Sequence, residues 1–306
     1  MPRKVRARWY DGGNNWGDVL NPELIRALSG REVCREPWHP EAPRWRRTRP
    51  GRMLYHLFAP VRHAIDAVRP PVHLVVGSTF QHADDRTQVW GAGFIRENAH
   101  VREKPRSIFA VRGPLSRRIL HASGIGCPDI YGDPALLYPL MHTPERHPPD
   151  YAIGIIPHLC DQHDPILGAW AESPEVKIIN MGGGVRQVAE DVCRCAHIIS
   201  SSLHGIVAAD AFGLPSGWMV LSDGVQGGGF KFRDYFASLN MEKQPLHVGS
   251  GISVRALIGH VQRGSLQGRI DLRKLLYACP FGDPNTIADW AGRLNAIGGN
   301  YLKCDE

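Results

Sequence analysis

The stretch HIISSSLHGIVAADAFG, residues 197–213, decides the fold class. Its first four residues, HIIS, contain two adjacent isoleucines and are typical of a short strand, the serines that follow form a polar turn, and the remainder favours a helix. A strand followed directly by a helix is half of a βαβ unit, and such units build parallel sheets that are covered by helices on both faces. The stretch therefore predicts an α/β fold.

The same alternation of strand and helix occurs in both halves of the chain. In the first half we expect strands at 5–10, 73–77, 88–92 and 107–111, and helices at 18–28, 54–68 and 114–122. In the second half we expect strands at 152–156, 176–180, 197–200 and 217–221, and helices at 166–172, 185–196 and 203–212. The pattern predicts two Rossmann-like, doubly wound domains that face a cleft.

A proline-rich segment separates the two halves. Residues 143–150, TPERHPPD, contain three prolines and several charges, which suit an exposed linker better than the interior of an element. We therefore expect an N-terminal domain over residues 1–147 and a C-terminal domain over residues 148–306. A last amphipathic helix is expected at 285–298, and it could cross back to pack on the first domain.

The composition is that of a globular protein. Hydrophobic residues make up 43% and charged residues 22% of the 306 positions, which argues against disorder. No apolar run reaches the roughly 18 residues that a membrane helix needs, and no signal-like apolar stretch follows the basic N-terminus, so we expect a cytoplasmic protein. The seven cysteines include no C-x-x-C pair, so we expect reduced thiols rather than a disulfide framework or a zinc ribbon.

The charge balance favours an anionic partner. The 36 Lys and Arg residues exceed the 30 Asp and Glu residues, for a formal charge of +6. Part of the excess lies in PWHPEAPRWRRTRPGR, residues 37–52, which is either a solvated loop or a contact for a polyanion or an anionic membrane surface. Its tryptophans would also suit single-stranded nucleic acid, but no RNA-recognition or zinc-finger motif accompanies them, so we expect no nucleic-acid partner.

Residues that directly follow strands are the candidates for chemistry, because two doubly wound domains bring the carboxyl ends of their strands to the cleft. The first candidate is the turn NNWGD, residues 14–18. Asp18 either caps the helix that begins there or acts as a base, or as a hydrogen-bond acceptor, for a substrate hydroxyl.

The second candidate is Arg112, which precedes Gly113 and Pro114. Pro114 suits the first turn of a helix, so Arg112 lies beside the positive end of that helix. The helix dipole would repel an arginine with a purely structural role at this position. An anion bound by both the arginine and the helix start would remove this repulsion. We therefore expect Arg112 to bind an anion rather than to form a surface salt bridge.

The third candidate is the turn SSSLHG, residues 200–205. Hydroxyls and free backbone N–H groups at a helix start form an anion pocket, and His204 is placed there to donate or shuttle a proton. In the alternative interpretation, Ser201 or Ser202 caps the helix and His204 only packs. We favour the functional interpretation because the turn lies at the expected cleft.

The remaining candidates are less specific. Glycines 227–229 precede Lys231, which fits both a mobile loop that delivers a cation and an ordinary exposed lysine. Glycines 182–184 precede a helix, but without a following Lys-Ser/Thr they do not form a P-loop. Several metal-ligand types lie close together without a regular zinc spacing, so we expect no metal site; they are His158, Cys160, Asp161, His163 and Asp164.

Eight blocks of sequence together resemble the polysaccharide pyruvyl transferases. In chain order they are NNWGD, HLVVGS, VWGAGF, FAVRGPLS, YGDPALLYP, IGIIPHLCD, SSLHG with IVAADAFGLP, and KFRDYFASL, from about residue 14 to residue 239. Each block is weak alone, but their order and spacing make the match fairly specific. The resemblance implies a GT-B-like pair of domains, phosphoenolpyruvate as donor, and a sugar acceptor that receives pyruvate as a cyclic ketal with release of phosphate.

The resemblance also implies roles for individual residues. Asp18 matches the acidic residue after the family's N-x-G-D turn, Arg112 its phosphoenolpyruvate-binding arginine, and His204 the histidine of its Leu-His motif. We expect His204 to be the main acid/base and Asp18 to orient or deprotonate the acceptor. The N-terminal domain then holds the acceptor side and the C-terminal domain the donor side, and the chemistry requires no metal or redox cofactor.

Binding residues follow from the same resemblance. Donor binding is expected from Arg112, Ser202, Leu203, Gly205 and Lys231, and acceptor binding from Asn15 and Ser78. Many members have an arginine where this chain has Ser202, so we expect Lys231 or Arg233 to supply the missing charge.

Two other functions stay open at this point. A GT-B-type glycosyltransferase would use a nucleotide sugar, since a fold alone does not determine the donor. A protein of the same fold could also bind a glycan or an anion without catalysis. The basic segment 37–52 would suit a lipid-linked oligosaccharide acceptor, which leaves peripheral contact with the inner membrane face open as well.

Overall fold

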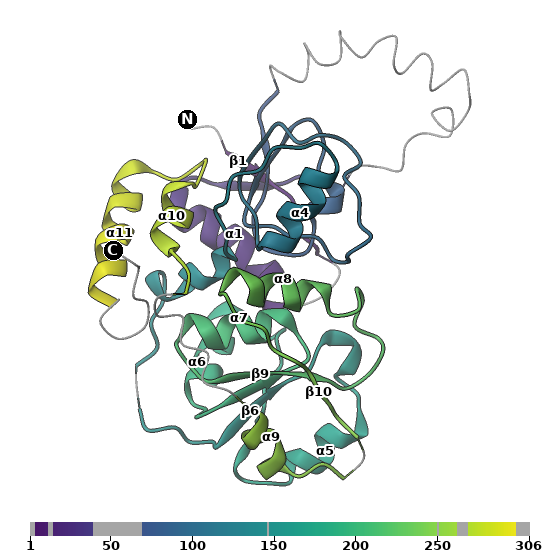
Figure 1. The fold of residues 1–306 in the computed structure, drawn as a ribbon. Coiled ribbons are helices and arrows are strands. Elements are labelled where there is room, and N and C mark those ends of the chain that lie inside the picture. The colour runs from purple at the N-terminus through teal and green to yellow at the C-terminus, as the bar shows by residue number, and fades with distance from the viewer. Residues whose placement is uncertain are drawn as a thin grey trace.

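The computed structural model describes residues 4–11, 15–38, 69–145, 147–249, 251–261 and 269–297. Within these residues the chain forms two five-stranded sheets, and every strand pair in them is parallel (Figure 1). The predicted α/β fold is confirmed. We call the first sheet with its helices the first lobe and the second sheet with its helices the second lobe.

The first sheet has the order β2-β1-β3-β4-β5. Its strands are β1 (Val5–Ala7), β2 (Val33–Arg35), β3 (Val72–Leu74), β4 (Thr87–Trp90) and β5 (Ser107–Ala110). The helical elements of this lobe are α1 (Trp16–Ser29), η2 (Phe80–His82), α4 (Pro114–Ala122) and η3 (Pro134–Leu140).

The second sheet has the order β10-β9-β8-β6-β7. Its strands are β6 (Ile153–Ile156), β7 (Val176–Ile178), β8 (Ile198–Ser200), β9 (Ser216–Val220) and β10 (Leu246–His247). The helical elements are η4 (Leu159–Asp161), α5 (Pro165–Ala171), α6 (Val185–Cys193), α7 (Leu203–Ala211), α8 (Phe230–Ser238) and α9 (Val254–His260).

Both sheets share one strand order, which determines where a site can form. Numbered within its own sheet, each order is 2-1-3-4-5, the flavodoxin-like arrangement rather than the Rossmann order 3-2-1-4-5. The direction of winding reverses between the first and third strands of each sheet, and ligands bind at the carboxyl ends of those strands. The switch points are therefore the ends of β1 and β3 in the first lobe and of β6 and β8 in the second.

The C-terminal helices lie on the first lobe although they follow the second in sequence (Figure 1). These are α10 (Leu272–Tyr277) and α11 (Pro284–Ile297), beside α1. Trp90 Nε1 donates to the carbonyl of Leu275 at 2.8 Å, and the guanidinium of Arg31 donates to the carbonyl of Phe281 at 2.7 Å. The chain therefore crosses from the first lobe to the second and back.

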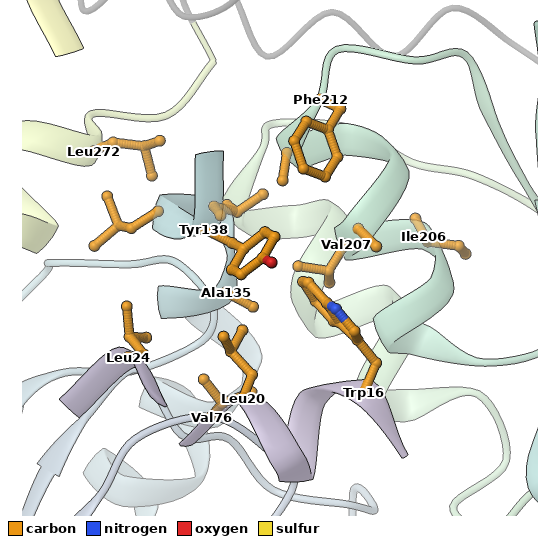
Figure 2. Packing of buried hydrophobic residues seen from close by; sticks show 14 of the residues in the cluster. Trp16, Leu20, Leu24, Val76, Ala135, Tyr138, Ile206, Val207, Phe212 and Leu272 are labelled. Atoms are coloured by element: carbon orange, nitrogen blue, oxygen red, sulfur yellow. The ribbon is translucent and has the colours of Figure 1, made fainter. Parts of the chain in front are cut away.

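One hydrophobic core runs through both lobes (Figure 2). The ring of Trp16 from α1 packs edge-on against Tyr138 of η3, with centroids 5.5 Å apart, and Tyr138 packs in turn against Phe212 at 6.1 Å. Trp16 Nε1 also donates to the carbonyl of Val185 at the start of α6, across the two lobes, at 3.0 Å. Shared apolar burial therefore contributes to the relative placement of the lobes.

A buried polar cluster also joins the lobes. Arg112, after β5, pairs with Asp234 of α8 at 3.0 Å, and both side chains are fully buried. The Asp234 carboxylate also accepts hydrogen bonds from the backbone N–H and the hydroxyl of Ser116, at 2.9 and 2.6 Å. Position 113 must be glycine here, because a Cβ would lie 1.9 Å from the carbonyl oxygen of Asp234.

The structure changes several of the expected elements. The first strand ends at Ala7 rather than at residue 10, and the short edge strands β2 and β10 were not expected because they are too short to show a period. The helix expected at 203–212 is α7, but all nine of its residues are buried, so it is not amphipathic. The helix expected at 54–68 and most of the basic segment 37–52 lie outside the described residues.

In the described part of the chain, no helix is both long enough and apolar enough to cross a membrane.

The Arg112–Asp234 pair yields a stability prediction. Asp234→Ala leaves a buried guanidinium without its counter-charge, so we expect the free energy of unfolding to fall by about 3 to 5 kcal/mol in urea titrations. The control is Glu97→Ala, which removes an exposed partner 3.9 Å from Arg233 and should change the same quantity by less than about 1 kcal/mol. Equal effects of the two substitutions would show that the buried pair does not hold the lobes together.

Candidate active site

A cavity of about 1090 Å³ lies at the switch points of both sheets. Asn15 and Asp18 follow β1 and Ser78 follows β3, while His158 follows β6 and the turn from Ser202 to His204 follows β8, and all of them line the cavity. Lys231, at the start of α8, completes the inner wall. The strand order thus brings together residues that are far apart in the sequence.

Asn15 and Asp18 are positioned by the first turn of α1. Asn15 caps the helix by accepting a hydrogen bond from the N–H of Gly17 at 3.2 Å, so the alternative in which Asp18 caps it is wrong. Asp18 lies one turn further on, only 9% exposed, and it lines the cavity. Burial raises the pKa of Asp18 from 3.8 to about 7, and the nearby positive charge of Lys231 limits the rise.

The turn before α7 leaves backbone donors at the cavity. Ser200 Oγ accepts from the N–H of Ser202 at 2.9 Å and donates to carbonyl oxygens, while Ser202 is the N-cap residue and its side chain makes no capping bond. Among the described residues, nothing accepts from the backbone N–H groups of Leu203 and His204. These unpaired N–H groups carry the partial positive charge of the helix start, and they lie at the cavity wall.

The imidazole of His204 is held between the two lobes. Its Nδ1 lies 3.3 Å from Asn15 Oδ1, and its Nε2 lies 3.8 Å from Asp133 Oδ2. Gly17 packs directly on the ring, since a Cβ at that position would be 2.2 Å from Nδ1. Burial lowers the pKa of His204 to about 3, helped by the positive charges of Lys231 and Arg112, so the ring is neutral when the cavity holds no anion.

Lys231 is a buried cation of the cavity wall, which Arg96 and Arg102 also line. It is 9% exposed, and burial followed by the charge of Arg112 lowers its pKa to about 8. Arg233 points elsewhere: it donates to the carbonyl of Gly228 at 2.8 Å, faces Glu97, and lines a neighbouring hollow instead. Lys231 and Arg233 were the two residues expected to supply the positive charge that Ser202 lacks. Of these two, Lys231 lines the same cavity as Ser202.

Arg112 stands behind the cavity wall rather than in it. The anion that we expected between Arg112 and the start of α4 is the carboxylate of Asp234, a residue of the same chain. Arg112 reaches the cavity only through Ser78, whose hydroxyl accepts from its guanidinium at 2.7 Å and lines the cavity. Gly205, also expected to bind the donor, lies in α7 and does not line the cavity.

Two groups at the site were not assigned from the sequence. Asp133, in the YGDP block, caps η3 by accepting from the N–H of Ala135 at 3.0 Å, and it faces His204. Its only sequence signal is an Asp-Pro pair, which marks many helix starts. The outer end of the cavity is lined by Tyr10 and by Trp38, whose ring lies 4.8 Å from that of His82.

The rival motifs have structural roles. Asp161 is buried and accepts from the hydroxyls of Ser201 and Ser222, and Asp164 caps α5. Among the described residues, no three His, Cys, Asp or Glu side chains come together as a group that could hold a metal ion. Glycines 182–184 precede α6, whose start is covered by Trp16 and does not line the cavity.

Comparison with known proteins links this geometry to a family. Residues 71–222 match the family model described as polysaccharide pyruvyl transferase. The chain is 24% identical over 255 residues to the succinoglycan biosynthesis protein ExoV of Rhizobium meliloti (strain 1021), covering 82% of this chain and 69% of that protein. It is 28% identical over 178 residues to the uncharacterized protein L143 of Acanthamoeba polyphaga mimivirus, covering 55% of this chain and 60% of the viral protein.

The pKa of Asp18 predicts how stability varies with pH. The pKa of Asp18 is about 7 in the folded state and 3.8 in the unfolded state, so between these pH values the folded state binds a proton that the unfolded state releases. The free energy of unfolding therefore falls as the pH rises from about 4 to about 7. Asn cannot ionise, so the variant Asp18→Asn does not show this fall. At about pH 8 we expect its free energy of unfolding to be higher than that of the unsubstituted protein by up to about 4 kcal/mol. The gain should vanish near pH 4 in urea titrations; an equal gain at both pH values would contradict the raised pKa.

Proposed function

Residues 71–222 belong to the polysaccharide pyruvyl transferase family, and from this premise we propose that the protein transfers pyruvate from phosphoenolpyruvate to a sugar of a cell-surface polysaccharide or of its precursor. The product is a cyclic ketal, and phosphate is released. The observation that carries the proposal is the inner wall of the cavity, where a buried lysine and a helix start face a carboxyl group with a pKa of about 7. This wall offers binding for an anionic donor next to a group that can take a proton from a hydroxyl.

The donor binds on the side of the second lobe in this proposal. Phosphoenolpyruvate carries a phosphate and a carboxylate, and the site offers the ammonium of Lys231 and the free N–H groups of Leu203 and His204. The hydroxyl of Ser202 is close by on the same wall. Arg112 adds positive potential from behind and holds Ser78 in place.

The acceptor binds on the side of the first lobe. Asp18, Asn15 and Ser78 supply a carboxyl, an amide and a hydroxyl, the groups with which proteins bind sugar hydroxyls. Further out, the rings of Tyr10 and Trp38 provide apolar faces on which the rest of a saccharide can lie. A lipid-linked oligosaccharide acceptor and peripheral contact with the inner face of the membrane are part of this proposal.

The reaction balances with two sugar hydroxyls. A proton adds to the methylene carbon of the donor, which becomes a methyl group, and C2 acquires oxocarbenium character. One hydroxyl adds to C2 and loses its proton, the bond from C2 to the phosphate oxygen breaks with its electron pair going to phosphate, and the second hydroxyl closes the ketal as it loses its own proton. We assign the proton donation to His204 and the deprotonation of the acceptor to Asp18, whose pKa of about 7 suits a base at neutral pH.

The two-lobe arrangement supports a GT-B-like mode of action. Each lobe has its own parallel sheet, and the cavity lies at the carboxyl ends of strands from both. Such an arrangement lets donor and acceptor approach each other from opposite walls, which is the geometry that a transfer reaction needs.

The direct test is incubation with phosphoenolpyruvate and a panel of synthetic or lipid-linked glycosides. We expect one of the glycosides to gain the mass of pyruvate less one water, with one phosphate released for each product. Turnover of a nucleotide sugar in place of phosphoenolpyruvate would show a glycosyltransferase instead. Ligand binding without turnover of either donor would show a non-catalytic protein.

A matched pair of variants tests the donor site. Lys231→Gln removes the buried cation beside Asp18, so we expect the KM for phosphoenolpyruvate to rise by about 10-fold or more, as expected for a lost charge-assisted contact. Arg233→Gln removes an equal charge two residues away, outside the cavity, and should leave KM within about 3-fold. Steady-state phosphate release measures both. A larger effect of Arg233→Gln would place the donor in the neighbouring hollow.

A further inference from the structure

Two buried polar atoms at the site face each other without a partner. Asp133 Oδ2 and His204 Nε2 are both buried, and among the described residues neither has a hydrogen-bond partner. They lie 3.8 Å apart, about 1 Å more than a hydrogen bond between such atoms. Buried polar atoms without partners are rare, and two that point at each other indicate an interaction that closes with a small shift.

The other ring nitrogen shows how many protons the pair holds. His204 Nδ1 lies 3.3 Å from Asn15 Oδ1, and the same oxygen accepts from the N–H of Gly17. Because this oxygen can only accept, a hydrogen bond there requires a proton on Nδ1. If Asp133 were ionised and Nε2 unprotonated, two lone pairs would face each other across the gap. A hydrogen bond between Nε2 and Oδ2 therefore requires one proton on the pair.

The surroundings hold this arrangement in place. Asp133 is fully buried, and its other oxygen is fixed by the N–H of Ala135 at 3.0 Å. The imidazole cannot move toward α1, because Gly17 already touches it. These contacts restrict the movement of both groups, so Asp133 sets the orientation of the ring.

We propose that Asp133 is the positioning residue of His204, and that the two side chains share one proton between Oδ2 and Nε2 that keeps Nδ1 protonated toward Asn15. The effect of this pair on turnover rests on the proposed function, whereas the shared proton itself does not. Asp133 acts through His204 and does not itself line the cavity.

The location of the shared proton depends on the charges that face the pair. Burial lowers the pKa of His204 to about 3, together with the charges of Lys231 of α8, Arg112 after β5 and His158 before η4, and burial raises the pKa of Asp133 to about 6. Asp18 of α1 lines the same cavity. With the cavity empty and the pH below about 6, the shared proton therefore lies on Asp133. An anion in the cavity offsets the positive charges, so the proton moves to Nε2 and His204 becomes an imidazolium.

The test is Asp133→Asn, which keeps the oxygen that caps η3 and replaces the oxygen that faces His204 by an NH₂ group. This group can donate a hydrogen bond to Nε2 but cannot give up its proton. We expect an unchanged thermal unfolding midpoint, a fall in kcat of about 100-fold, and a KM for phosphoenolpyruvate within about 3-fold. The control Asp271→Asn changes a cap carboxylate of the same kind on α10, outside the cavity, and should leave kcat unchanged.

A readout that does not depend on turnover is the ¹⁵N spectrum of the histidine rings, with His204 assigned by His204→Gln. Adding phosphoenolpyruvate or inorganic phosphate should move the original protein's His204 signals from the neutral to the imidazolium position, and Asp133→Asn should keep them neutral. Identical His204 signals in both proteins, with and without the anion, would overturn the proposal. If no glycoside is pyruvylated, the proposed function is wrong. The ¹⁵N spectra with and without inorganic phosphate still test whether Asp133 and His204 share a proton.

Discussion

The buried ion pair between Arg112 and Asp234 is the interaction on which the geometry of the site depends. It links the first lobe to α8 of the second, and α8 begins with the cavity lysine, Lys231. The pair is fully buried, so either charge alone would be strongly unfavourable, and the hydroxyl and N–H of Ser116 complete the binding of the carboxylate. The placement of the donor wall relative to the acceptor wall therefore depends in part on an interaction outside the cavity.

Burial of charged groups gives the site its chemistry. Desolvation raises the pKa of Asp18 to about 7 and lowers that of Lys231 to about 8, so both titrate close to neutral pH. The same burial lowers the pKa of His204 to about 3, because Lys231 and Arg112 act in the same direction as desolvation. The site is thus adapted to an anionic ligand, whose negative charges would offset the positive ones and allow His204 to take up a proton.

Much of the architecture was predictable because it depends on local patterns. The alternation of apolar runs and helices predicted the α/β class, and the helix at 114–122 has the expected bounds because Pro114 marks its start. The edge strands β2 and β10 were missed because they have three and two residues, which is too short for the alternation of apolar and polar residues that marks a strand. The helix α7 was predicted, but the burial of its polar residue Asp210, which accepts hydrogen bonds from the hydroxyls of Ser216 and Tyr235, is visible only in the tertiary structure.

By itself, the sequence determined the class of fold and the turns after strands that carry polar residues, because strand, turn and helix signals act over a few neighbouring positions. Asn15, Asp18, Ser202, Leu203 and His204 lie in these turns, whereas Lys231 was named from the glycine run before it and Ser78 from the family resemblance. The structure places all of them at one cavity. Only the tertiary structure decided what Arg112 binds and what His204 faces. Asp234 and Asp133 lie 122 and 71 positions from those partners, and electrostatic pairing and burial depend on distance in space, which no local pattern reports.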